Sequence, residues 1–271
     1  MLIDTHCHIN IMTKESFDTA LLPHDYHIAQ QIVDSAKQED VCIIFNVGTS
    51  LIESMNCVEL AKRLPEIYAV VGIHPNDLTH DWRTDMAQLK KLVSAKNTHK
   101  IVAIGECGLD FHYPDYNIMR QQDAFKTQIE LALEHSLPLV VHTRDAGDET
   151  LRSLEAFKDT QLRGVIHCFS EDLAFAQEAI KLGFVLGIGG TITYPKNGAL
   201  RAVVSTLGLD HIILETDAPY LPPQSLRGKK NSPSNIRIIA QYIAELLQTD
   251  LETVAQRTTQ TVQKIFKYQD I

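Results

Sequence analysis

The feature that most constrains the fold is a regular alternation of short apolar runs and longer amphipathic stretches along all 271 residues. The apolar runs are rich in Val, Ile and Leu, as in Val41–Phe45, which is typical of parallel strands buried on both faces. The amphipathic stretches predict the helical crossovers that parallel strands need. We expect strands at Leu2–Cys7, Val41–Val47, Ile67–Ile73, Ile101–Glu106, Leu137–His142, Gly164–Cys168, Gly183–Ile188 and His211–Glu215. The expected helices include Ile28–Gln38, Thr84–Lys96, Asn117–Ser136, Leu173–Leu182, Asn235–Leu247 and Leu251–Phe266.

Eight strand and helix repeats in a chain of this length favour a closed (β/α)8 barrel, a TIM barrel, in one domain that spans residues 1–271. A doubly wound open sheet is the alternative. Neither a GxGxxG sequence after the first strand nor a Walker loop is present to support it.

The composition places the chain among globular proteins, with 44% hydrophobic and 22% charged residues. No apolar run approaches the roughly 20 residues of a membrane span, and the start of the sequence lacks the pattern of a signal peptide. We therefore expect a cytoplasmic protein without a membrane partner.

The five cysteines are odd in number and lack CxxC spacing, which indicates reduced thiols. Strand alternation predicts that Cys7, Cys107 and Cys168 face away from the polar residues beside them.

Polar side chains recur where the predicted strands end. His6 and His8 are two residues apart in the first strand, so both point to the same face. The corresponding residues at the other strand ends are His74, Glu106, His142, His167 and Asp217. In a (β/α)8 barrel all of these would meet at the carboxyl-terminal face, where active sites lie.

This mixture of imidazoles and carboxylates suits two divalent metal ions, with Glu106 able to span both. Such a pair lowers the pKa of a shared water, and Asp217 could bind metal and accept the water proton. Glu106 and Asp217 are therefore the expected catalytic residues. Magnesium, manganese and zinc are all compatible with these ligand types.

Four further residues are candidates for contacts with a substrate. His74 and Arg144 stand at strand ends beside the expected ligands, and Arg227 and Lys230 belong to a basic loop after the last strand. Arginine and lysine match phosphate oxygens well, and a solvated loop is the alternative for Arg227 and Lys230. A glycine run at residues 187–190 either binds phosphate through backbone amides or serves only the turn geometry.

Six ordered motifs carry a resemblance that spans nearly the whole chain. They are Asp-Thr-His-Cys-His at 4–8, Val-Gly-Ile-His-Pro at 71–75, Ile-Gly-Glu-Cys-Gly-Leu-Asp at 104–110, Leu-Pro-Leu-Val-Val-His-Thr-Arg at 137–144, His-Cys-Phe-Ser at 167–170 and Leu-Glu-Thr-Asp-Ala-Pro-Tyr-Leu at 214–221. Together they resemble the TatD family of metal-dependent deoxyribonucleases, within the amidohydrolase-like TIM barrels.

The resemblance implies that His6, His8, Glu106 and Asp217 bind one metal, and that Glu106, His142 and His167 bind the second. It also implies hydrolysis of DNA phosphodiester bonds, often from a 3′ end. Many related dimetal enzymes bridge their metals with a carbamylated lysine on the fourth strand, but Ile101–Cys107 contains no lysine, which favours the TatD branch. Ser232 departs from the family pattern, where an acidic residue is more common.

Three functional hypotheses follow. The first is a dimetal exonuclease that acts on single-stranded DNA or frayed ends, with no obligate protein partner. A net charge of −9 argues against a broad basic surface for duplex DNA, but it allows a strand end to enter a metal-lined pocket. The second is a metal-dependent ester or amide hydrolase, such as a D-aminoacyl-tRNA deacylase. The third is a metal-stabilised binding scaffold, which an open set of ligands disfavours.

Overall fold

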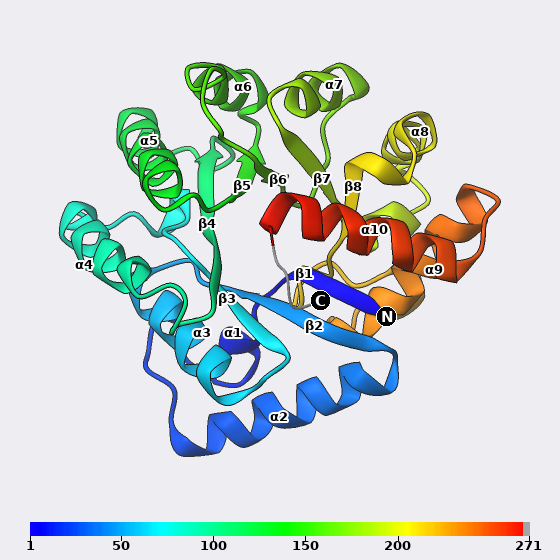
Figure 1. Ribbon diagram of the computed structural model, residues 1–271, viewed down its shortest axis with the longest axis horizontal. Coiled ribbons are helices and arrows are strands. Elements are labelled where there is room, and N and C mark those ends of the chain that lie inside the picture. The colour runs from blue at the N-terminus through cyan, green and yellow to red at the C-terminus, as the bar shows by residue number, and fades with distance from the viewer. Residues whose placement is uncertain (268–271) are drawn as a thin grey trace.

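The computed structural model describes residues 1–267 and shows the expected (β/α)8 barrel (Figure 1). One sheet contains eight parallel strands in the order of the sequence. The strands are β1 Leu2–Cys7, β2 Val41–Val47, β3 Ile67–Val71, β4 Ile101–Asp110, β5 Leu139–Arg144, β6 Gly164–Ile166, β7 Phe184–Ile188 and β8 Ile212–Leu214.

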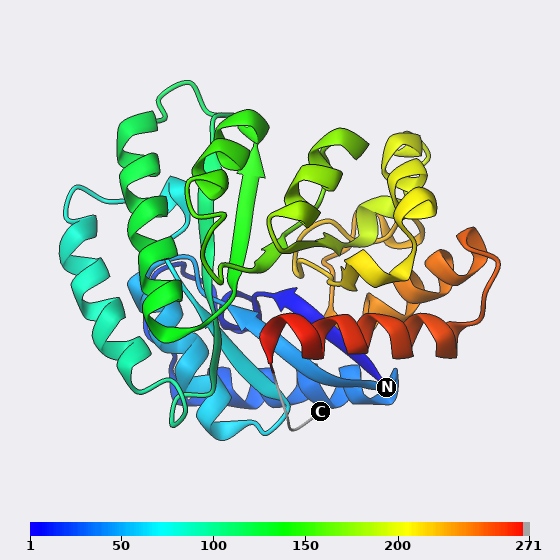
Figure 2. The same ribbon diagram turned by 45° about the horizontal axis from the view of Figure 1, so that its top comes forward.

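Helices surround the strands on the outside of the barrel (Figure 2). They are α1 Ile9–Met12, α2 Pro23–Gln38, α3 Leu51–Arg63, α4 Trp82–Ser94, α5 Ile118–His135, α6 Gly147–Glu155, α7 Leu173–Lys181, α8 Gly198–Leu207, α9 Ile236–Leu246 and α10 Leu251–Phe266. Short 3-10 helices lie in the loops at Pro75–Asp77, Gly190–Thr193, Leu209–His211, Gln224–Leu226 and Pro233–Asn235. No helix within residues 1–267 is long and apolar enough to cross a membrane.

Strand alternation divides the core into two apolar layers. Phe45 and Val47 point into the barrel, whereas Ile44 packs outward against the helices. Phe266 of α10 extends the inner layer, and its ring centroid lies 4.8 Å from that of Phe45. The terminal helix therefore covers the end of the barrel opposite the carboxyl ends of the strands.

The barrel closes between the first and last strands through backbone contacts at their carboxyl ends. The Asp217 amide donates to the His6 carbonyl at 2.8 Å, and the His8 amide donates to the Ala218 carbonyl at 2.8 Å. Asp4 reinforces this seam, because its carboxylate accepts hydrogen bonds from the Thr216 amide and hydroxyl at 2.9 and 2.6 Å. The closure brings the His6–His8 segment against Asp217.

Strands β3, β5 and β8 end one or two residues from the expected positions, whereas the ends of β4 and β6 differ in ways that shape the site. Strand β4 continues four residues beyond Glu106 to Asp110, and it runs very close to β5. A Cβ at Gly108 would lie 2.0 Å from the His142 carbonyl oxygen, so glycine is required there. Strand β6 stops at Ile166, two residues early, because Cys168 has a φ of 47° and its amide donates to Glu215 rather than to the sheet.

Candidate metal centre

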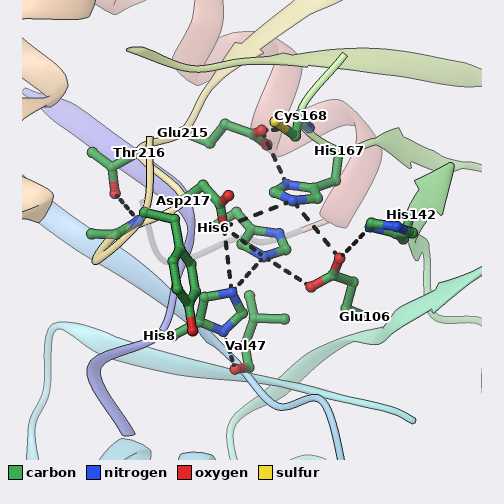
Figure 3. Close-up of polar contacts among 12 residues, drawn as sticks. His6, His8, Val47, Glu106, His142, His167, Cys168, Glu215, Thr216 and Asp217 are labelled. Carbon is green, nitrogen blue, oxygen red and sulfur yellow. Dashed lines mark hydrogen bonds and ion pairs between the residues drawn. The ribbon is translucent and has the colours of Figure 1, made fainter. Parts of the chain in front are cut away.

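The six expected metal ligands converge at the carboxyl ends of the strands (Figure 3). From β1, the Nε2 atoms of His6 and His8 lie 3.3 Å apart. Glu106 of β4 extends from across the barrel, with Oε2 3.4 Å from His6 Nε2. Asp217, after β8, places Oδ1 3.4 Å from His8 Nε2. These donors form a compact group with nitrogen and carboxylate atoms only a few ångströms apart.

Glu106 lies between this group and the histidines of the next strands. Its Oε1 is 2.9 Å from Nδ1 of His142 on β5 and 3.8 Å from Nε2 of His167 after β6. His167 also approaches Asp217 Oδ1 at 3.8 Å, and its ring stacks on His6 with 3.5 Å between centroids. The carboxylate that the sequence predicts to be shared by two metals thus contacts imidazoles on both sides.

Three buried groups set the orientation of the imidazoles. The Nδ1–H of His8 donates to the Val47 carbonyl at 2.9 Å, which leaves the Nε2 lone pair directed into the centre. His167 Nδ1 lies 3.0 Å from Oε1 of Glu215, and His142 Nε2 lies 3.1 Å from Oδ2 of Asp110. Partners of this kind orient histidines that bind metal and raise their basicity.

The arrangement of acceptors fits a divalent cation. His8 Nε2 and Asp217 Oδ1 are both acceptors in this tautomer, and at 3.4 Å they repel unless a proton or a cation lies between them. Nitrogen and carboxylate oxygen are the ligand types that zinc and manganese take, and carboxylate oxygen also suits magnesium. His6, His8 and Glu106 form one group of donors within reach of a single ion.

The charges of the buried groups are strongly coupled. Burial alone would raise the pKa of Glu106, but the charge of His167 and the hydrogen bonds from His142 and His6 hold this pKa well below its usual range. Burial would lower the pKa of His167, yet Glu215 and Glu106 raise it to about 10. The Glu106 carboxylate is therefore ionised, and His167 is protonated. In the metal-free centre this proton supplies positive charge that a bound metal ion would otherwise supply.

His74 also lies in the centre, but it presents a hydrogen-bond donor there, whereas His8 presents an acceptor. Its Nδ1 accepts a hydrogen bond from the Asn76 amide at 3.1 Å, so its proton is on Nε2, 3.6 Å from Glu106 Oε1. Burial and the neighbouring His142 lower its pKa to about 3, so the ring is neutral. His74 is thus a hydrogen-bond donor that faces the centre, as a substrate contact requires.

A cavity of about 670 Å³ opens above the donors. His74 and Arg144 line it, and the Arg144 guanidinium lies 5.8 Å from the centroid of the Tyr113 ring. Among the described residues, the lining includes neither Arg227 nor Lys230. Arg227 instead lies over the Tyr194 ring, 4.8 Å from its centroid. Of the four expected substrate contacts, His74 and Arg144 therefore line the cavity, whereas Arg227 and Lys230 do not.

Cys168 also lines the cavity, so the expectation that it faces away from the ligands was wrong. Its positive φ breaks the strand alternation on which that expectation depended. Cys7 and Cys107 are fully buried, and the five cysteines form no disulfide among the residues described.

Three functional residues escaped the sequence reasoning. Asp110 and Glu215 orient His142 and His167, and both side chains are buried. Buried Asn231 donates to the Thr216 and Tyr220 carbonyls, each at 2.8 Å, and so fixes the loop that carries Asp217. The available signal was the position of Asp110 and Glu215 inside the motifs at 104–110 and 214–221, and of Asn231 directly after the basic Lys230.

The glycine run serves the centre by making space. A Cβ at Gly187 would lie 2.1 Å from Glu215 Oε2, and a Cβ at Gly190 would lie 2.5 Å from the Leu221 carbonyl. Gly187 therefore admits the carboxylate that orients His167, which supports the structural explanation for this run.

An eight-stranded barrel with this donor set at the carboxyl ends of its strands defines a metal-dependent hydrolase. Residues 3–267 match the family described as TatD related DNase. The chain belongs to this family.

Several relatives are similar to this chain over nearly its full length. The chain is 34% identical over 267 residues to the uncharacterized metal-dependent hydrolase YabD of Bacillus subtilis (strain 168), which covers 98% of this chain and 99% of YabD. It is 32% identical to the 3′-5′ ssDNA/RNA exonuclease TatD of Citrobacter rodentium, over 87% and 90% of the two chains. The crystal structure of YjjV, a TatD homologue from Escherichia coli K12, matches with a TM-score of 0.88 at 30% identity, over 99% and 98% of the chains.

Proposed function

We propose that this protein is a divalent-metal-dependent phosphodiesterase that removes nucleotides from the end of a DNA strand, in the 3′-5′ direction. The observation that carries the proposal is the donor set around Glu106, which contacts imidazoles on both sides at 2.9 to 3.8 Å. The relative named as a 3′-5′ ssDNA/RNA exonuclease supports the reaction and the single-stranded substrate.

In this proposal, His6, His8, Glu106 and Asp217 hold one divalent ion, and Glu106, His142 and His167 hold a second. When bound, ions of this kind lower the pKa of water and neutralise charge on phosphate oxygens. Magnesium, manganese or zinc would each be accepted by these donors.

Asp217 is the proposed base. Its Oδ1 faces the imidazoles of His6, His8 and His167, which outweigh the effect of burial and lower the pKa of the carboxyl. It is therefore ionised at neutral pH and can accept a proton from the attacking water. Hydrogen bonds from Thr216 to Asp4 and from Asn231 to Thr216 hold the segment that carries this carboxylate.

His74 and Arg144 are the proposed contacts to the substrate phosphate. The neutral His74 directs Nε2–H into the centre. Arg144 lines the cavity, and none of the ion pairs formed within residues 1–267 involves its guanidinium, so its charge is available to an anion. Arg227 and Lys230 would contact only a more distant part of the strand, because neither lines the cavity within the described part of the chain.

The experiment is a comparison of bond types with the metal-loaded protein. Turnover would be measured on single-stranded DNA, on bis-p-nitrophenyl phosphate, on p-nitrophenyl acetate and on D-aminoacyl-tRNA, each with Glu106→Gln as the matched inactive variant. We expect hydrolysis of the two phosphodiesters, lost in Glu106→Gln, and a strong loss on DNA in Arg144→Gln. Hydrolysis of only the carboxylic esters would contradict the proposal and favour the deacylase hypothesis.

A further inference from the structure

We propose that Phe17, Tyr113 and Tyr220 form an aromatic rim that stacks on the unpaired terminal base of the strand being hydrolysed. All three side chains line the cavity above the metal centre. They are 48%, 49% and 51% exposed, respectively, although aromatic faces gain free energy when they are covered. The inference depends on the proposed function, because it names what the same site holds beside the phosphate.

Phe17 is the most informative member, because it has no polar atom and lies beside a cavity lined by charged and polar groups. It belongs to the loop between α1 and α2, which α3 holds through one buried carboxylate. Glu53 Oε1 accepts from Lys14 Nζ and from the Asp18 amide, both at 2.7 Å, so the loop is fixed on both sides of Phe17. An exposed aromatic ring held by a buried ion pair is preorganised for contact with a ligand.

Glu53 is itself tied into the barrel. Its Oε2 accepts from Asn10 Nδ2 at 2.9 Å and from Asn56 Nδ2 at 3.2 Å, and its side chain is fully buried. Asn10 lies two residues after His8, in α1. The loop that carries Phe17 is therefore held in a fixed relation to the metal ligands, which makes Glu53 a positioning residue for the rim.

Tyr220 contacts two of the expected ligands, and Tyr113 contacts His112 and Arg144. The Tyr220 amide donates to the Asp217 carbonyl at 2.8 Å, and its ring meets His8 edge to face, with 5.9 Å between centroids. Tyr113, in the loop after β4, stands edge to face with His112 at 5.4 Å and has the Arg144 guanidinium near one face.

The order of the strands places these rings on opposite sides of the cavity. Phe17 follows β1 and Tyr220 follows β8, which are adjacent at the seam, whereas Tyr113 follows β4, halfway around the barrel. A flat group that enters between the two sides would meet aromatic faces while its phosphate reaches the donors below.

A nucleobase is the flat group that this chemistry fits. Every base presents a π-face to an aromatic side chain, and such stacking tolerates any sequence. The cavity volume of about 670 Å³ lies within the range of about 300–1,000 Å³ for sites that enclose small ligands. A base must leave the duplex stack to expose both faces, and this costs least at a single-stranded end, so the rim favours such an end.

The test uses two oligonucleotides that differ only in the terminal 3′ base, thymine or 5,6-dihydrothymine. The second keeps the hydrogen-bonding groups but loses the planar aromatic ring. Phe17→Ala and Tyr113→Ala would be measured with both, alongside the matched controls Leu22→Ala and Met119→Ala. These two controls are 55% and 75% exposed and lie outside the cavity lining. Phe17→Tyr serves as the conservative variant.

We expect the rim variants to raise KM for the thymine substrate about 5- to 100-fold with little change in kcat, because stacking holds the ground state and the transition state alike. They should also lose the preference of the wild-type protein for thymine over dihydrothymine, and Phe17→Tyr should retain it. Rim variants that behave like Leu22→Ala while DNA is still hydrolysed would overturn the rim and leave the proposed function intact. A wild-type protein that does not hydrolyse DNA would overturn both.

Discussion

Oε1 of Glu215 lies 3.0 Å from Nδ1 of His167, and both side chains are buried. The carboxylate also accepts the Cys168 amide at 2.6 Å, so the loop after β6 and the end of β8 are held together at one oxygen. Gly187 on β7 provides the space for it. Glu215 thus sets the ring orientation and the basicity of His167, which is a proposed metal ligand.

This relationship predicts the effect of Glu215→Gln. The amide is nearly isosteric, but it removes the negative charge that favours the Nδ1-protonated ring. We expect the affinity for zinc or manganese to fall about 10- to 100-fold, the range found when such partners of metal ligands are changed. Metal titration by calorimetry of the chelator-treated protein measures this directly, with circular dichroism as the control for folding. An unchanged affinity would show that Glu215 has only a structural role.

Two residues show how far the sequence reasoning reached. Strand ends predicted that the six expected ligands converge, because parallel strands in a barrel all end at one face. Asp110 was missed because β4 extends beyond Glu106, and this extension depends on the close contact between Gly108 and His142 of β5, a tertiary effect. Glu215 was recognised only as the end of a strand, since nothing local indicates that its side chain crosses to β6.

For the basic loop, the sequence grouped residues that the structure separates. The sequence grouped Arg227 and Lys230 with His74 and Arg144 as candidate substrate contacts, because a basic loop after the last strand belongs to the mouth of the barrel. A 3-10 helix at Gln224–Leu226 and the contact of Arg227 with Tyr194 direct Arg227 elsewhere. Loop conformation of this kind is set by contacts between loops, which periodicity and motif spacing do not report.

The raised pKa of His167 predicts how the metal-free protein responds to pH. Its pKa is about 10 in the folded state and 6.5 as the ordinary value, so the folded state binds the proton more tightly. That contribution to stability is complete below pH 6.5 and is lost as pH rises toward 10. We therefore expect the Tm of the chelator-treated protein to fall between pH 7 and 9, and the stabilisation by added metal to grow over the same range.

Thermal unfolding with chelator and with manganese, at matched ionic strength, measures both trends. Glu215→Gln should flatten the pH dependence of the metal-free protein, since Glu215 is the largest favourable influence on the His167 proton. A Tm that rises with pH in chelator would contradict the assignment of the proton to the metal-free centre.

Glu53 and Glu59 offer a matched pair for the stability of the loop that carries Phe17. Both lie on α3, but the Glu53–Lys14 pair is buried, with side chains 0% and 5% exposed, whereas the Glu59–Lys62 pair is 44% and 36% exposed. Removing one partner of a buried pair costs about 3–5 kcal/mol, and an exposed pair contributes about 0–1 kcal/mol.

We therefore expect Glu53→Ala to lower the free energy of unfolding by about 3–5 kcal/mol, and Glu59→Ala by less than about 1 kcal/mol. Urea unfolding followed by fluorescence or circular dichroism distinguishes them. Equal losses would mean that Glu53 does not anchor the loop as its four hydrogen-bond donors indicate.

The most direct test of the account is hydrolysis of a single-stranded oligonucleotide by chelator-treated protein, with zinc, manganese or magnesium returned separately. Substrates labelled at the 3′ or the 5′ end would be resolved by length, beside Glu106→Gln and Asp217→Asn. We expect no cleavage without metal, stepwise shortening from the 3′ end after metal is returned, and none in either variant. Cleavage that persists in chelator, or in metal-loaded Glu106→Gln, would contradict the metal centre as the site of reaction.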